Sequence, residues 1–110
     1  MNLEIISLPT FTKKVKQLYK KYKKLPNDLE NLAQELSSNP TSGIHLGNSC
    51  YKIRLANSSI PTGKSGGFRI IYYYLNEDSN KLFLMTIYSK RDLENIDDTQ
   101  ILEILHDNGF

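Results

Sequence analysis

The sequence predicts an α+β fold in which a pair of helices packs on one face of an antiparallel sheet. Apolar residues recur at helical spacing over residues 10–36, whereas they alternate with polar residues over residues 51–56. Two further runs, over residues 68–75 and 82–89, are rich in β-branched and aromatic residues and are separated by a polar turn. The predicted order is β-α-α-β-β-β-α, and we expect the whole chain, residues 1–110, to form one domain.

The N-terminal third is expected to hold a strand and two helices. Residues 3–8 form a short apolar run that Pro9 ends. Residues 10–22 carry an apolar stripe at helical spacing, opposite a face rich in lysine. Pro26 suits the first turn of a second helix, which the Asn-Pro pair at residues 39–40 stops. The two helices should form a tight hairpin.

The C-terminal part is expected to be a three-stranded meander followed by a closing helix. Residues 41–49 are turn-rich, and the strand after them places Tyr51, Ile53 and Leu55 on one face. Lys52 and Arg54 point to the other face, so we expect the basic residues on the side of the sheet away from the helices. Residues 97–106 have helical spacing, with Asp97, Asp98 and Thr99 as capping candidates.

The charges are unevenly distributed along the chain. The formal net charge is +2, yet no Asp or Glu occurs over residues 36–76. That stretch contains Lys52, Arg54, Lys64 and Arg69. A basic centre without carboxylates is typical of a surface that binds an anion, and nucleic acid is the commonest polyanion.

Arg69 is the most informative of these cations. Its neighbours Phe68, Ile70 and Ile71 belong to an apolar strand, in which an arginine is costly unless it is paired or faces a ligand. Because no carboxylate lies nearby in the sequence, a phosphate is the natural partner of Arg69.

The triplet Gly63-Lys64-Ser65 matches the end of a nucleotide-binding Walker A loop. The full motif needs a further glycine five residues earlier, where this chain has Ser58, and it should lead into a helix. Here the run FRIIYYYL follows, and its composition indicates a strand. The pattern therefore disfavours a nucleotide hydrolase.

Several other function classes lack the residues they need. The single cysteine, Cys50, excludes an internal disulfide and fits a reducing cytoplasm. No apolar run approaches the ~20 residues that span a bilayer, so we expect no membrane contact. His45 and His106 have no second ligand at metal-binding spacing, and we expect neither a metal nor another cofactor.

Clustered cations can themselves cleave RNA. Like charges crowded together lower the pKa of a lysine, which can then act as a general base on the 2′-OH of RNA. Arginines could hold the charge that develops on the scissile phosphate, and a second cation could protonate the departing 5′ oxygen. The strand geometry is expected to bring together Lys52, Arg54, Lys64, Arg69, Lys90 and Arg91.

The runs YKIRLANSS, GKSGGFRIIYYYL and LFLMTIYSKRDL, in this order, closely resemble the RelE/ParE superfamily of bacterial toxins, particularly its HigB and RelE types. The resemblance covers about residues 3–105, and GKSGGFRIIYY is its most specific part. It implies a RelE-like fold. It also implies that the glycines let the backbone turn tightly into the strand that presents Arg69.

This resemblance implies a toxin of a type II toxin–antitoxin system, a cytoplasmic endoribonuclease that cuts mRNA in the ribosomal A site and inhibits translation. Its partner would be a cognate antitoxin, a small DNA-binding protein of helix-turn-helix type. The resemblance assigns catalysis to Lys52, Arg54, Arg69 and, in the RelE type, Arg91, while Lys64 and Lys90 match basic positions of the HigB-like branch.

One departure from the RelE pattern concerns a catalytic tyrosine. RelE-type toxins have it a few residues after the position of Arg91, where this chain reads DLENID. Tyr73 or Tyr88, on neighbouring strands, would have to stack on a base or position the phosphate, or the role is absent. The alternative for each tyrosine is simple packing.

Two further questions stay open at this point. The lysine face of the first helix, with Lys20 and Lys23, either docks on ribosomal RNA or is an ordinary solvated face. The alternative function is a ParE-like inhibitor of DNA gyrase without enzymatic activity, and another is an RNA-binding or repressor domain without catalysis. The basic constellation favours the ribonuclease, because the gyrase-inhibiting branch largely lacks it.

Overall fold

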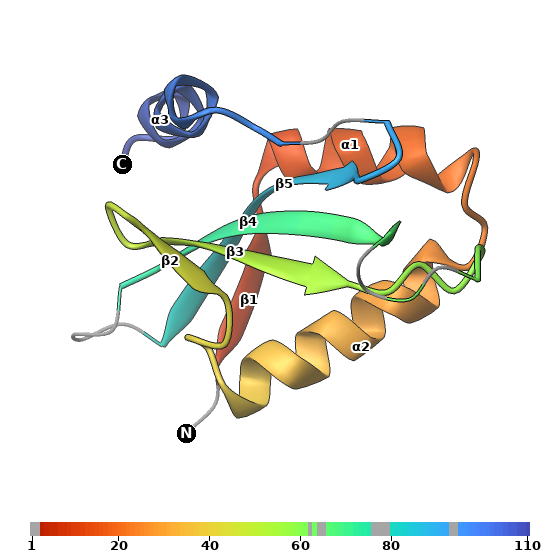
Figure 1. Cartoon of the computed structure of the whole chain (residues 1–110). Helices are drawn as coiled ribbons and strands as arrows, with labels where there is room; N and C mark the ends of the chain where they lie inside the picture. Colours follow the sequence, from red (N-terminus) through yellow and green to blue (C-terminus); the bar gives the residue numbers. More distant parts are fainter. Residues whose placement is uncertain (1–2, 62, 64–65, 76–79, 93–94) are drawn as a thin grey trace.

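The computed structural model describes residues 3–61, 63, 66–75, 80–92 and 95–110. Its elements follow the chain from a short N-terminal strand to a C-terminal helix (Figure 1). In chain order they are β1 (Glu4–Ser7), α1 (Pro9–Tyr19), α2 (Leu25–Ser38), β2 (Ile44–Gly47), β3 (Cys50–Leu55), β4 (Phe68–Tyr74), β5 (Lys81–Ser89) and α3 (Asp98–Asp107). Within this described part, no helix has the length and apolar character needed to cross a membrane.

The five strands form one sheet in the order β1-β5-β4-β3-β2. The pairs β2–β3, β3–β4 and β4–β5 are antiparallel, as expected for a meander. The first strand, β1, lies parallel to β5, because the α1–α2 hairpin and the meander separate the two strands in the chain. The predicted α+β fold is therefore confirmed.

The two N-terminal helices cover one face of the sheet. Figure 1 shows α1 alongside β5 and α2 alongside β3. Between helices and sheet lies the larger apolar core, which includes Phe11, Leu25, Leu32, Leu36, Ile53, Phe68, Ile70, Tyr72 and Leu82. These residues come from alternate positions of the strands, so the remaining strand residues point to the opposite face.

The opposite face is covered by α3 over only part of its area. Ile101 and Leu105 of α3 pack with Cys50, Ile71 and Met85 in a second, smaller core. A capping box at Asp97 fixes the start of this helix, because its side chain accepts from the backbone N–H of Gln100 at 2.9 Å. The C-terminal helix predicted from its spacing and its cap is confirmed.

Two local features differ from the sequence prediction. Residues 41–49 contain the edge strand β2 as well as a turn, because Ile44 and His45 pair with β3. The first helix ends at Tyr19, and Tyr22 lies beyond it in the core, where its ring meets Phe68 edge-to-face at 5.5 Å. Tyr22 therefore lies in the core, as its apolar spacing indicates, although it is not part of the helix.

Candidate functional site

Three polar side chains form a row across β3, β4 and β5. Arg54 is the cross-strand neighbour of Arg69, and Arg69 is the neighbour of Tyr88. All three occupy the strand positions that point away from α1 and α2, since their chain neighbours belong to the larger core: Leu55, Phe68, Ile70 and Ile87. We call Arg54, Arg69 and Tyr88 the cross-strand row.

The two arginines of the row differ in their exposure. Arg54 is exposed, whereas Arg69 is only 8% exposed. Arg69 donates from a guanidinium nitrogen to the carbonyl oxygen of Phe68 at 3.2 Å. A buried positive charge acts through a medium of low dielectric constant, so its attraction for a nearby phosphate is screened less than that of a surface charge.

Lys52 joins the row through Asn95. The ammonium group of Lys52 and the hydroxyl group of Tyr88 both donate to the Oδ1 atom of Asn95, at 3.3 and 3.2 Å. Lys52 comes from β3 and Tyr88 from β5, so Asn95 bridges the two outer strands of the β3–β4–β5 meander. Sequence reasoning missed Asn95, because its position depends on the path that the chain takes after β5.

The hydroxyl group of Tyr88 is a hydrogen-bond donor at neutral pH. Burial raises the pKa of Tyr88, although the charge of Arg69 and a backbone hydrogen bond from Ile96 act in the opposite direction. A phenol with a raised pKa keeps its proton, so Tyr88 donates to Asn95 at neutral pH and is unsuited to act as a base.

The start of β4 lies close to the ends of β3 and β5. The backbone N–H of Lys90 donates to the carbonyl oxygen of Gly67 at 2.9 Å, which places Lys90 beside the start of the strand that carries Arg69. A Cβ atom at Gly67 would overlap the carbonyl oxygen of Leu55. A glycine is therefore needed here for close backbone approach. Lys64, the other basic residue of this glycine-rich segment, lies outside the described residues.

Arg91 is exposed and follows Lys90 directly after β5. Its backbone N–H donates to the Oγ atom of Ser89 at 3.3 Å. The adjacent Asp92 forms an ion pair with Lys21 at 3.2 Å, which joins this segment to the connection between α1 and α2. The structure thus places Arg91 at the same end of β5 as Tyr88.

The structure separates Tyr73 from the cross-strand row. Tyr73 lies four positions after Arg69 on β4, where its ring packs against Phe110 at 4.6 Å and Phe83 at 6.3 Å. This aromatic group borders α3, at the opposite end of the strand from Arg69. Of the two predicted tyrosines, only Tyr88 lies beside the cations.

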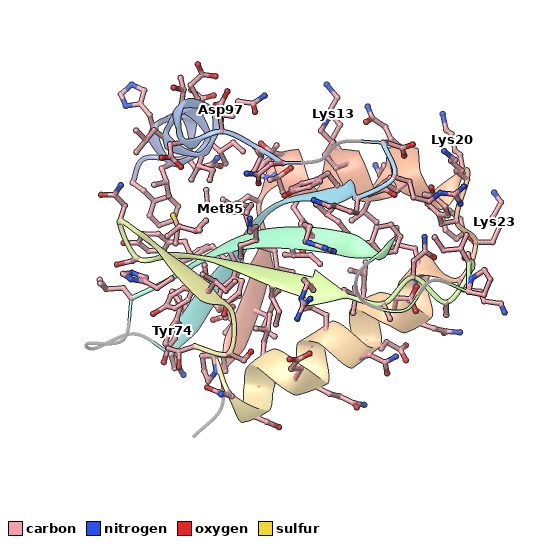
Figure 2. The ribbon with its side chains drawn as sticks, viewed as in Figure 1. Lys13, Lys20, Lys23, Tyr74, Met85 and Asp97 are labelled. Atoms are coloured by element: carbon pink, nitrogen blue, oxygen red, sulfur yellow. The ribbon has the colours of Figure 1, made fainter. Side chains whose placement is uncertain are left out.

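Lys20 and Lys23 are exposed at the connection between α1 and α2. Figure 2 shows both side chains pointing outward beyond the end of α1. The ammonium group of Lys23 lies 4.9 Å from the centre of the Tyr19 ring. These lysines form a basic surface that is distinct from the sheet face.

The two histidines lie apart from the cross-strand row. The ring of His45 lies tilted against that of Tyr51 on β3, with 5.0 Å between ring centres, and His106 lies near the end of α3. No group of three or more His, Cys, Asp or Glu residues that could hold a metal ion occurs in residues 3–61, 63, 66–75, 80–92 and 95–110.

Comparison with known proteins gives a fold neighbour. No family model matches this sequence. The chain is similar to a solved structure of the E. coli toxin RelE, a double arginine-to-alanine mutant in the free state. The TM-score is 0.62 at 14% sequence identity, and the match covers 100% of both chains. The likeness confirms a RelE-like fold, whereas the HigB assignment stays a prediction.

Proposed function

We propose that this chain is the toxin of a type II toxin–antitoxin system and that it cleaves mRNA on the ribosome. The observation that carries the proposal is the cross-strand row with Lys52 beside it. This arrangement gathers a base candidate, two phosphate-binding arginines and a hydroxyl donor on one face of the sheet. The RelE-like fold agrees with this function.

The proposed reaction uses the 2′-OH of RNA as the nucleophile. Lys52 serves as the general base: its side-chain nitrogen takes the proton of the 2′-OH, and the 2′ oxygen attacks the adjacent phosphorus. The bond from phosphorus to the 5′ oxygen breaks, and Lys90 or Arg91 delivers a proton to that oxygen. The products are a 2′,3′-cyclic phosphate and a 5′-OH.

The arginines stabilise the charge that develops on the phosphate. Arg54 is exposed and can make direct hydrogen bonds to the equatorial oxygens, while Arg69 adds a buried charge from the neighbouring strand. Tyr88 donates to the Oδ1 atom of Asn95. This hydrogen bond fixes the position of the oxygen that also accepts from Lys52. The ribosome supplies the remaining positioning, by holding the mRNA with its 2′-OH in line with the phosphate.

The test is primer extension on mRNA in a reconstituted translation reaction. The wild-type chain should produce new mRNA ends only when ribosomes are present. Arg69→Ala should lower the cleavage rate about a hundredfold, because one such charge-stabilising contact is worth ~3 kcal/mol. Lys81→Ala, at the opposite end of β5, is the control and should cleave normally.

Three results would contradict the proposal. A folded Arg69→Ala variant with full activity would show that the site lies elsewhere. Inhibition of gyrase supercoiling without any mRNA cleavage would instead assign the chain to the ParE-like function. Binding of mRNA without cleavage would indicate an RNA-binding domain with no catalytic role.

A further inference from the structure

A cavity of about 160 Å³ lies at the edge of the sheet, beside the cross-strand row. It opens just before β2 begins, because Ile44, the first residue of β2, pairs with Lys52 and no β2 residue pairs with Arg54. The last turns of α2 contribute Glu35 to its wall. Its lining residues are Glu35, Ser42, Gly43, Ile44, Lys52, Ile53 and Arg54.

Glu35 gives this cavity a chemistry that differs from that of the row. It is half-buried, and no ion pair joins it to Lys52 or Arg54 within the described residues, although all three line the same space. A carboxylate repels a phosphate but accepts hydrogen bonds from N–H groups. The cavity therefore suits an uncharged group that carries N–H donors and is attached to a phosphate.

The wall of the cavity is held in place before any ligand binds. The hydroxyl group of Tyr72 donates to the carbonyl oxygen of Pro40 at 2.7 Å and accepts from the backbone N–H of Gly43 at 3.1 Å. A Cβ atom at Gly43 would lie 2.9 Å from the carbonyl oxygen of Lys52, so only glycine fits at this position. Tyr72 itself is fully buried and stacks on Tyr51 at 5.2 Å. Such support is typical of a preformed binding site.

We propose that this cavity binds the base of a guanine nucleotide whose phosphate lies over Arg54 and Arg69. The inference rests on the proposed RNA substrate. Guanine presents two adjacent donors, N1–H and the N2 amino group, which match the two oxygens of the Glu35 carboxylate. Adenine and cytosine present a single amino group beside an acceptor, and uracil presents one N–H between two acceptors, so guanine is the best match.

The remaining lining residues complete the fit for a planar base. Ile44 is 66% exposed and offers an apolar surface, and the planar guanidinium group of Arg54 can stack on a base. Neighbouring strands lie ~5 Å apart, so a base at the outer edge of β3 is one strand away from Arg69 on β4. One nucleotide can therefore reach both the cavity and the row.

The test is a titration of the isotope-labelled chain with GMP, AMP, CMP and UMP, followed by NMR chemical shifts. GMP should bind about tenfold more tightly than UMP, as expected for one bidentate contact to a base. Glu35→Gln should abolish this preference and leave weak binding of all four nucleotides, because the amide N–H₂ group would face a guanine donor. Glu30→Gln, an exposed change on the same helix, is the matched control and should keep the preference.

Equal affinity for the four nucleotides, or a preference for GMP that persists in Glu35→Gln, would overturn the inference. An equal loss of all four nucleotides in Glu35→Gln would do so as well, since it would point to a general effect on the fold. Binding in this titration requires neither ribosomes nor cleavage. A chain that prefers GMP but never cuts mRNA would therefore contradict the proposed function and leave the guanine site standing.

Discussion

Arg54 on β3 and Arg69 on β4 are directly opposed in the sheet register, on the face away from α1 and α2. Like charges in directly opposed positions destabilise an antiparallel pair. The fold therefore maintains an arrangement that lowers its own stability, and such arrangements are common where a charged ligand binds.

Replacing Arg54 should separate stability from activity. Arg54→Thr removes the repulsion at an exposed strand position and should raise the free energy of unfolding by roughly 0.5 kcal/mol. The same change should remove most of the mRNA cleavage. Arg54→Lys keeps the charge and should leave the stability unchanged. Thermal unfolding measures the change in stability. A lower melting temperature for Arg54→Thr than for the wild type and Arg54→Lys would contradict the opposed-charge interpretation.

The two tyrosines should respond differently to loss of their hydroxyl groups. Tyr88→Phe removes the donor to Asn95, which should cost about 1 kcal/mol of stability and lower cleavage by about tenfold. Tyr73→Phe keeps the ring that packs against Phe110, so both stability and cleavage should stay near wild type. Equal effects of the two changes, measured by unfolding and primer extension, would remove Tyr88 from the site.

The basic surface at the end of α1 should contribute to ribosome binding. Lys20→Glu with Lys23→Glu should weaken co-sedimentation with ribosomes, and the loss should grow steeply with added salt, as it does for phosphate contacts. Lys81→Glu makes the same charge change at the far end of β5. If the double variant co-sediments like wild type, this surface is an ordinary solvated face.

Cys50 should make stability depend on alkaline pH. Burial raises the pKa of the Cys50 thiol from 9.0 to about 11. The unfolded thiol loses its proton near pH 9, while the folded thiol keeps it. The contribution of Cys50 to the free energy of unfolding is therefore fully present below pH 9 and is lost as pH rises toward 11. The loss should reach about 2 kcal/mol.

Cys50→Ala is the comparison for this effect, because it lacks the titrating group. Urea unfolding at several pH values should show the stability difference between wild type and Cys50→Ala narrowing above pH 9. A stability difference between the two proteins that stays constant with pH would mean that Cys50 has the same pKa in the folded and unfolded chain, which would contradict the prediction.

Much of this site follows from local sequence patterns. Strand alternation over residues 51–56 is sufficient to place Lys52 and Arg54 on the face away from the helices. The apolar neighbours of Arg69 likewise predict its burial. These properties depend on chain neighbours alone, so they can be predicted without knowing how the strands pair.

Other parts depend on contacts between distant segments. Alternation puts Tyr73 on the same face of the sheet as Arg69, but the position of α3 decides that Tyr73 packs under a helix. Asn95 reaches Lys52 across 43 residues of sequence, and Glu35 lines its cavity only because α2 passes the edge of β3. No periodicity in the sequence contains this information.

The nucleophile is the central claim of the proposed function, and one substrate tests it directly. An mRNA that carries 2′-methoxy in place of the 2′-OH at the cut position should resist cleavage when this chain acts on it on the ribosome. The unmodified mRNA should be cut in parallel, also after EDTA treatment that leaves ribosomes intact, and its new 5′ end should carry a hydroxyl. Cleavage of the 2′-methoxy mRNA at the normal rate would mean that water is the nucleophile, and the mechanism built on Lys52, Arg54 and Arg69 would be wrong.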